Sequence, residues 1–230
     1  QMGSSDASTK TNREASASEP EPYSRAPQDS PSPENSSPAF LDGRRLPAPV
    51  SSTASKNSFF TVYDAGTKQL LKVSEQEFLV SALACEMDLS APEEALKAQA
   101  VAARTFAVKR AMAGTVVDDT TSFQAYRAPL AESSPRSRQA VVETAGQVLT
   151  YGGEVIDCFY SASNGGTCKR SGEVWSRDYP YYVNKPDPWD TAARTEKSTN
   201  PSHGVGLSQV GCMWAAKQGV PYNEILAFYY

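Results

Sequence analysis

Glu86 is a carboxylate on a predicted helical face that is otherwise apolar. Leu79, Leu83 and Glu86 are spaced at i, i+4 and i+7, so their side chains share one side of that helix. A carboxyl group in such a place loses hydration, which disfavours its charged form and raises its pKa, as a general acid working near neutrality requires. The alternative is a glutamate near a helix end that pairs with a cation.

Two cations recur at helical spacing in the following segment. Lys97 and Arg104 are seven residues apart, on the same side as Val101 and Val108, and alanines with Leu96 line most of the remaining surface. A helix that is apolar almost all round is buried. The pattern therefore directs both cations to the interior or to a cleft, although side chains that snorkel along the edge of the core would have the same spacing.

Capping signals divide this region into two helices. Ser74 with Glu77, and Ser90 with Glu93, both match the S-x-x-E capping box, and each pair opens an apolar run. Lys109 and Arg110 in the last turn, followed by Gly114, are typical of a helix C-terminus. The sequence therefore predicts consecutive helices that begin near residues 74 and 90.

Strand patterns flank the predicted helices. Residues 59–64 and 69–73 favour a hairpin, and residues 148–151 and 154–160 favour a second hairpin around Gly152 and Gly153. Shorter helices are predicted at 137–144, at 208–218 and from residue 223. We expect an α+β fold in which a helix-rich core carries antiparallel strands, and long loops form a substrate cleft.

Five aromatic residues gather within a stretch of 15 residues. They are Trp175, Tyr179, Tyr181, Tyr182 and Trp189. Aromatic faces stack on pyranose rings, and they also pack into small satellite cores. The sequence leaves both interpretations open.

Composition separates an N-terminal spacer from a folded domain. The chain has 230 residues, 40% of them hydrophobic, and a net charge of -4, which gives no basic footprint for nucleic acid. Residues 1–57 hold half of the 16 prolines and few large apolar side chains, so we expect a disordered spacer followed by a domain at 58–230. With no apolar run long enough for a bilayer, any membrane anchor is expected upstream of residue 1.

Four cysteines and one histidine allow three further chemistries. Cys158 and Cys168 lie close in sequence and are the first pair to consider for a disulfide. A structural zinc would need His203 together with cysteines from separate segments, and no C-x-x-C spacing is present. A cysteine peptidase or amidase would combine His203 with an activated thiolate at Cys85 or Cys168.

The longest motif is CEMDLSAPEEALKAQAVAARTFAVKR at residues 85–110, which resembles the core of the SpoIID family, the stage II sporulation protein D proteins and their amidase-enhancer relatives. The resemblance continues through the segments GQVLTY from Gly146, YSASNGG from Tyr160, DPWD from Asp187 and HGVGLSQ from His203. Asp88 replaces the proline that follows the methionine in the family. Ser161 stands where several relatives have histidine, which removes a possible metal ligand.

The resemblance implies lytic transglycosylation of peptidoglycan glycan strands. A member of this family cleaves the bond between N-acetylmuramic acid and N-acetylglucosamine in strands without stem peptides, and leaves 1,6-anhydro ends. Glu86 would act first as acid and then as base. Hydrolysis would need a second carboxylate, for which Asp187, Asp190 and Glu173 are candidates. The alternative implied by the enhancer branch is a non-catalytic glycan binder that stimulates a cell-wall amidase.

The resemblance also implies the remaining site residues and the setting. Lys97, Gln99 and Arg104 match the family core and are expected to position Glu86 and the sugar. Tyr160, Ser163 and His203 are expected to line the cleft, with Ser208 and Gln209 in its wall beside the N-terminus of a helix. No catalytic metal or cofactor is expected. We expect an extracytoplasmic protein of the cell envelope that works beside an amidase or endopeptidase.

Overall fold

The computed structural model describes residues 40–41, 44–45, 50–52, 59–64, 68–114, 117–118 and 134–230. All of them belong to one compact unit, Pro31–Tyr230. Most of the predicted spacer at 1–57 lies outside the described residues, so its disorder stays a prediction. None of the described helices combines the length and the apolar character that a bilayer span needs.

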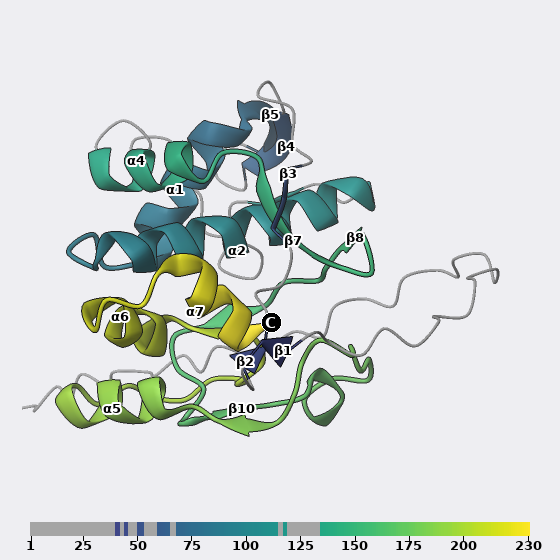
Figure 1. Cartoon of the computed structure of the whole chain (residues 1–230). Helices are drawn as coiled ribbons and strands as arrows, with labels where there is room; N and C mark the ends of the chain where they lie inside the picture. The colour runs from purple at the N-terminus through teal and green to yellow at the C-terminus, as the bar shows by residue number, and fades with distance from the viewer. Residues whose placement is uncertain are drawn as a thin grey trace, which may run out of the picture. The chain divides into compact units, whose positions relative to one another are not determined.

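Helix α2 (Glu93–Met112) is the central element of the fold. It contacts α1 (Glu75–Glu86) and α4 (Pro135–Glu143) on one side and α6 (Gln209–Lys217) and α7 (Tyr222–Tyr229) on the other, as Figure 1 shows. Eleven residues of α2 are buried, most of them alanine or other small side chains. Small side chains let neighbouring helices approach closely, so α2 forms the middle of the core, as its nearly all-round apolar surface predicts.

The two predicted capping boxes have different outcomes. At α1, the Ser74 side chain accepts from the Glu77 backbone N–H and the Glu77 side chain accepts from the Ser74 N–H, which confirms the first box. The second box is wrong. Ser90 donates through its backbone N–H and its hydroxyl to Asp88, both at 2.8 Å, and Pro92 is the N-cap of α2. The nearer carboxylate of Asp88 therefore takes the hydroxyl that would have capped the helix.

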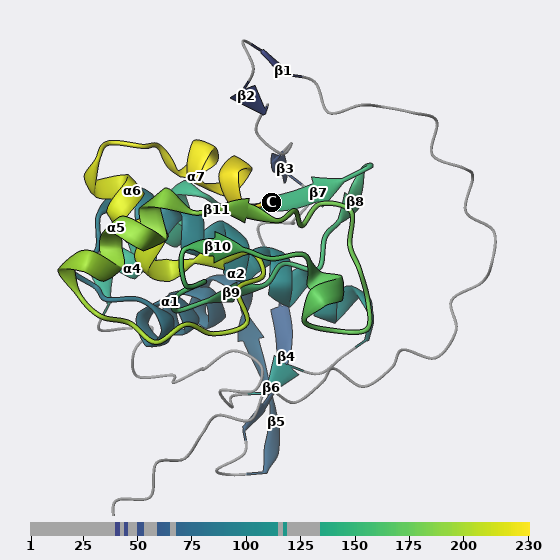
Figure 2. The ribbon, with the colours of Figure 1, turned by 90° about the horizontal axis from the view of Figure 1, so that it is seen from below.

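Short strands surround the helices, so the α+β class is confirmed. The predicted first hairpin is formed by β4 (Phe59–Asp64) and β5 (Gln69–Ser74), which extends from the helices in Figure 2. β6 (Val117–Asp118) pairs with β4 in parallel, and β1 (Phe40–Leu41) pairs with β2 (Arg44–Arg45).

A three-stranded sheet contains the second hairpin. β7 (Gln147–Tyr151) lies between β3 (Val50–Ser52) and β8 (Glu154–Val155). Gly152 and Gly153 have φ of 59° and 84°, the left-handed values that the glycine pair predicts. Of the strand expected at 154–160, only the two ends are strand in the structure, Glu154–Val155 as β8 and Tyr160 as the first residue of β9.

The C-terminal half is organised by a parallel pair of strands that the sequence did not reveal. β9 (Tyr160–Ser161) pairs with β12 (Leu207–Ser208), which leads directly into α6. Between them, β10 (Thr167–Cys168) pairs with β11 (Lys185–Pro186), a short 3-10 helix covers Ser171–Glu173, and α5 spans Pro188–Glu196. The β9–β12 pair brings the loop after β9 next to the start of α6.

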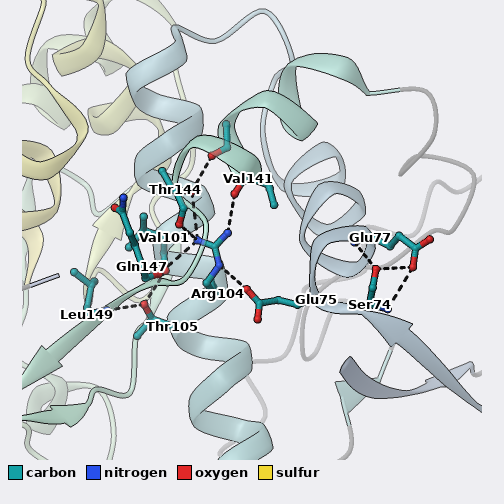
Figure 3. Close-up of polar contacts among 11 residues, drawn as sticks. Ser74, Glu75, Glu77, Val101, Arg104, Thr105, Val141, Thr144, Gln147 and Leu149 are labelled. Atoms are coloured by element: carbon teal, nitrogen blue, oxygen red, sulfur yellow. Dashed lines mark hydrogen bonds and ion pairs between the residues drawn. The ribbon is translucent and has the colours of Figure 1, made fainter. Parts of the chain in front are cut away.

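Arg104 ties α1, α2 and α4 into one unit (Figure 3). Its side chain is 1% exposed, and its Nε donates to Glu75 at 2.8 Å. Its Nη1 donates to the Thr144 carbonyl oxygen at 2.7 Å and its Nη2 to the Val141 carbonyl oxygen at 3.0 Å. These carbonyls lie at the C-terminal end of α4, where partial negative charge gathers, so the guanidinium is a favourable donor to them.

Replacing Arg104 by methionine should therefore destabilise the fold strongly. Loss of the guanidinium leaves Glu75 and two buried carbonyls without this donor, and we expect the free energy of unfolding to fall by about 3–5 kcal/mol. Urea denaturation followed by circular dichroism measures this. The control is Lys217→Met, because Lys217 forms an exposed ion pair with Glu196 at 3.8 Å and its loss should cost less than about 1 kcal/mol. Equal effects of the two substitutions would contradict the role of Arg104.

Candidate functional site

Glu86 and Gln209 meet at the junction of two helices. Glu86 is the last residue of α1 and is half-buried, and Gln209 is the first residue of α6. The Gln209 Nε2 donates to Glu86 Oε2 at 3.5 Å, across 123 positions of sequence. The structure thus brings together the predicted catalytic carboxylate and one predicted residue of the cleft wall.

Tyr160 lies in the strand pair that leads to this junction, and His203 lies in the segment before β12. Tyr160 is paired with Leu207 in the β9–β12 ladder, and Ser208 and Gln209 directly follow Leu207 in the chain. The His203 Nε2 lies 3.2 Å from the Tyr160 carbonyl oxygen, and the Tyr160 ring lies 6.5 Å from that of Phe106 on α2. Both predicted residues are half-buried, so they keep some accessible surface beside the strands.

The hydrogen bonds of His203 define its protonation state. The Val205 backbone N–H donates to Nδ1 at 3.1 Å, so Nδ1 is the acceptor and Nε2 carries the proton that is donated to Tyr160. Burial lowers the pKa of His203, and the hydrogen bond to Tyr160 opposes this only in part. A neutral imidazole with both nitrogens bound to the backbone orients the strand pair and is not available as a base for Cys85 or Cys168.

Ser163 and Ser208, which were expected to line a cleft, are fully buried instead. Both donate to the carboxylate of Asp190, Ser163 at 3.0 Å and Ser208 at 2.5 Å. The Asn164 backbone N–H donates to the same carboxylate at 2.9 Å. Their expected contact with sugar is therefore replaced by a structural one, in which they anchor the loop after β9 and the start of α6.

Asp187 is the second buried carboxylate of this network. It is the N-cap of α5 and accepts from the backbone N–H groups of Trp189 and Asp190, both at 3.0 Å. The Asn164 side-chain amide donates to its other oxygen at 2.7 Å and the Tyr229 hydroxyl at 2.9 Å. α5 was not predicted, although an aspartate followed by proline is a typical start of a helix.

The carboxylates that were candidates for the second group in hydrolysis all accept hydrogen bonds from other residues. Asp187 and Asp190 are 0% exposed and surrounded by donors, which stabilise a buried charge by hydrogen bonding. Glu173 is exposed and accepts from Asn184. Of these groups and Glu86, only Glu86 is both half-buried and placed at the meeting point of α1 and α6.

Lys97 is held by carboxylates of α2 and α4. Its Nζ lies 2.6 Å from Glu93, 3.1 Å from Glu94 and 2.7 Å from Glu143. The hydrogen bonds to Glu143 and Glu93 raise its pKa, so the ammonium group is a fixed charge between the helices. Like Arg104, it positions helices.

Gln99 is buried in the middle of α2 with an amide that has no hydrogen-bond partner among the described residues. One turn earlier, the Ala95 carbonyl oxygen lies 3.8 Å from Cys212 Sγ of α6. Gln99 therefore lies on the face of α2 that packs against α6, beneath the helix that carries Gln209.

The predicted aromatic cluster is partly core and partly surface. Tyr181 and Tyr182 are buried, and the Tyr182 hydroxyl donates to the Asp157 carbonyl oxygen at 2.7 Å. Trp175 and Tyr179 are half-buried around Phe159, with ring centroids at 4.6 and 6.2 Å from it. Tyr181 and Tyr182 are therefore part of a small satellite core and are not available for stacking on a sugar.

Cysteine chemistry finds little support. No disulfide joins the four cysteines, so the expected Cys158–Cys168 bridge is wrong. Cys158 and Cys168 are buried thiols, and burial raises the pKa of Cys168 to about 12, far from an activated thiolate. Within the described residues, no group of three or more His, Cys, Asp or Glu side chains could hold a metal ion.

Comparison with protein families confirms the expected resemblance. Residues 63–151 match the SpoIID family, described as Stage II sporulation protein. The matched region contains α1, α2, α4 and β7, and therefore Glu86, Lys97, Gln99 and Arg104.

Curated relatives extend the similarity. The chain is 47% identical over 105 residues to the "Amidase enhancer" of Bacillus subtilis (strain 168), covering 46% of this chain and 14% of that protein. It is 34% identical over 157 residues to "Stage II sporulation protein D" of the same organism, covering 60% of this chain and 46% of that protein. The Bacillus amyloliquefaciens protein of that name is 33% identical over 148 residues, covering 56% and 43%. The chain thus spans less than half the length of these relatives.

Replacing Gly211 by alanine should disrupt the buried carboxylate network. A Cβ there would clash with the Tyr229 hydroxyl and lie 3.0 Å from the Asp190 backbone nitrogen. Such overpacking costs about 1–3 kcal/mol, although alanine in a helix otherwise gains up to about 1 kcal/mol over glycine. We expect a net loss of unfolding free energy in urea, and we expect Tyr229→Phe to restore part of it in the double variant. Simple additivity of the two substitutions would show that the clash is absent.

His203 should make stability depend on pH. Its pKa is lower in the folded state than in the unfolded chain, so the unfolded chain binds more protons and stability falls as pH drops below about 6.5. His203→Gln cannot be protonated. The stability advantage of the parent over this variant should therefore shrink between about pH 7.5 and 5.5, as measured by urea unfolding at each pH. An advantage that stays constant would refute the assignment.

Proposed function

We propose that this chain, which carries a SpoIID-family region at residues 63–151, is a peptidoglycan lytic transglycosylase. Its substrate would be glycan strands whose stem peptides have been removed. It would cleave the bond between N-acetylmuramic acid and N-acetylglucosamine and leave 1,6-anhydro ends. The family match and the position of Glu86 at the junction of α1 and α6 support this proposal.

One carboxyl group performs both proton transfers in this reaction. Glu86 gives its proton to the glycosidic oxygen as the bond from that oxygen to the anomeric carbon breaks. The C6 hydroxyl oxygen of the muramic residue then bonds to the anomeric carbon, and its proton passes to the Glu86 carboxylate. Glu86 ends in its starting state and no water is consumed.

The contact between Glu86 and Gln209 is the observation that carries the proposal. A side-chain amide offers both a donor and an acceptor. Gln209 can therefore donate to the carboxylate form of Glu86 and, after rotation of its amide, accept from the carboxylic acid form. The distance of 3.5 Å is at the long limit of hydrogen bonding, as is common in catalytic sites before substrate binds.

The surroundings favour transglycosylation over hydrolysis. Hydrolysis uses a second carboxylate, and Asp187 and Asp190 are buried and already accept hydrogen bonds from neighbouring donors.

Arg104 and Lys97 act at a distance in this scheme. α1 has 12 residues and rises about 1.5 Å per residue, so Glu75 and Glu86 lie at its opposite ends. Arg104 binds Glu75 and therefore holds the end of α1 that is far from Glu86.

A second candidate function is stimulation of a cell-wall amidase. It is favoured by the 47% identity to a protein named "Amidase enhancer". In this case the region around Glu86 would bind glycan without cleaving it, and the amidase would be the partner. For either function we propose an extracytoplasmic site of action at the cell envelope, because the polymer lies there.

Product analysis with Glu86→Gln tests the proposal. The parent should release anhydro-ended saccharides from amidase-treated strands, and the variant should lose at least about 100-fold in rate, because general acid–base catalysis contributes about that much. Mass spectrometry of the soluble products measures both. The control is Glu154→Gln, an exposed carboxylate in the β7–β8 hairpin, which should cleave like the parent.

The alternative products separate the rival functions. Reducing ends in place of anhydro ends would mean hydrolysis and would overturn the single-carboxylate scheme. No release by the parent, together with retained glycan binding, would favour the enhancer function.

A further inference from the structure

The turn that follows Glu86 is held in shape by its own hydrogen bonds. Met87 is the C-cap of α1, and its backbone N–H still donates to a carbonyl oxygen of that helix, at 3.0 Å. The Asp88 carboxylate accepts from the Ser90 backbone N–H and hydroxyl, and the Ala91 N–H donates to the Asp88 carbonyl oxygen at 2.9 Å. The turn therefore has a defined shape, and it begins within two residues of Glu86.

Arg136 joins this turn to the first turn of α4. Its Nη1 donates to the Leu89 carbonyl oxygen, and its Nη2 donates to the Ala91 carbonyl oxygen at 2.7 Å. A planar guanidinium presents its donors at a fixed spacing, so the two carbonyls are held relative to each other and to α4. We call this pair of hydrogen bonds the Arg136 clamp.

The place of Arg136 in its own helix indicates which contact it serves. It is the second residue of α4, and the first turn of that helix has no acidic residue. A cation is unfavourable near a helix N-terminus, where partial positive charge gathers. The favourable contribution of Arg136 therefore comes from the two carbonyls of the turn and not from α4 itself.

Asp88 keeps the turn in the form that the clamp binds. Hydrogen bonds from Ser90 lower the pKa of Asp88, and the positive charges of Lys197 and Arg136 act in the same direction. The carboxylate is therefore ionised at neutral pH and continues to accept from Ser90. Arg136 thus acts on the turn twice, through two carbonyls and through the charge of Asp88.

The two ends of α1 are held by different arginines. Arg104 binds Glu75 at the first residue of the helix, whereas the last turn has no basic residue of its own. There the clamp holds the exposed turn that follows Glu86. The contact between Glu86 and Gln209 is already 3.5 Å long, at the limit of hydrogen bonding, so a small displacement of the end of α1 would break it.

We infer that Arg136 is a positioning residue for Glu86, and that its clamp on the turn keeps the carboxyl group within reach of Gln209. This inference rests on the proposed function, in which Glu86 transfers the proton. Because Arg136 acts through the turn, it should affect the rate of cleavage and not the binding of glycan.

Steady-state kinetics of Arg136→Gln on denuded strands of defined length tests the effect on rate. We expect kcat to fall about tenfold with an unchanged KM, because displacing a catalytic group by about 1 Å costs up to about 100-fold. Arg136→Lys keeps the charge but offers a single ammonium group in place of the planar fork, so it should also be slow. It tests the clamp even if Arg136→Gln does not fold.

The matched control is Arg170→Gln. It removes another exposed arginine, one that pairs with Asp178, and it should cleave like the parent. Urea unfolding of each variant shows that the protein is folded under the conditions of the assay.

A second readout does not depend on activity. The Gln209 side-chain amide donates to Glu86, so its NMR signal reports this contact, and Gln209→Ala identifies the signal by its loss. Arg136→Gln should move the signal towards its position in Glu86→Ala. Arg170→Gln should leave it in place.

Four results would overturn the inference. They are a parent-like kcat in either Arg136 variant, a loss that appears only in KM, an equal loss in Arg170→Gln, and a Gln209 signal that does not move. Product analysis of the parent judges the proposed function separately. A moved signal without anhydro products from the parent would refute only the transglycosylase, and anhydro products with an unmoved signal would refute only the clamp.

Discussion

Two carboxylates without solvent contact hold the C-terminal half of this structure together. Asp187 and Asp190 accept hydrogen bonds from the loop after β9, the start of α5, the N-cap of α6 and, through Tyr229, from α7. A buried carboxylate is costly unless donors surround it, so these elements must all be in place together. The position of Gln209 follows directly, because Ser208 fixes the first turn of α6.

The N-terminal half uses a buried cation in the same way. Arg104 joins α1 to the C-terminal end of α4, and Lys97 adds a second bridge to Glu143. Glu86 thus lies where the two halves of the domain meet, and each half is fixed by buried charges that neighbouring groups satisfy. In both halves, predicted site residues belong to these networks, Lys97 and Arg104 in one and Ser163 and Ser208 in the other.

Local signals could be read from the sequence, and distant partners could not. The Ser74–Glu77 cap, the course of α1 and α2 and the Gly152–Gly153 turn depend on neighbours within a few residues, and they were predicted. Ser163 and Ser208 were assigned to a cleft from the family resemblance. Their actual partner, Asp190, is 27 and 18 positions away, and nothing in composition identifies it. The Ser90 cap failed for a local reason, competition by Asp88.

The β9–β12 pair and the Glu86–Gln209 contact also set the order in which the site can form. The two site residues are 123 positions apart, and contacts of such separation form late because a long loop must first close. A nascent chain that has emerged only as far as α4 already contains Glu86 but lacks Gln209, which begins α6. The Glu86–Gln209 contact therefore forms only after α6 has been synthesised.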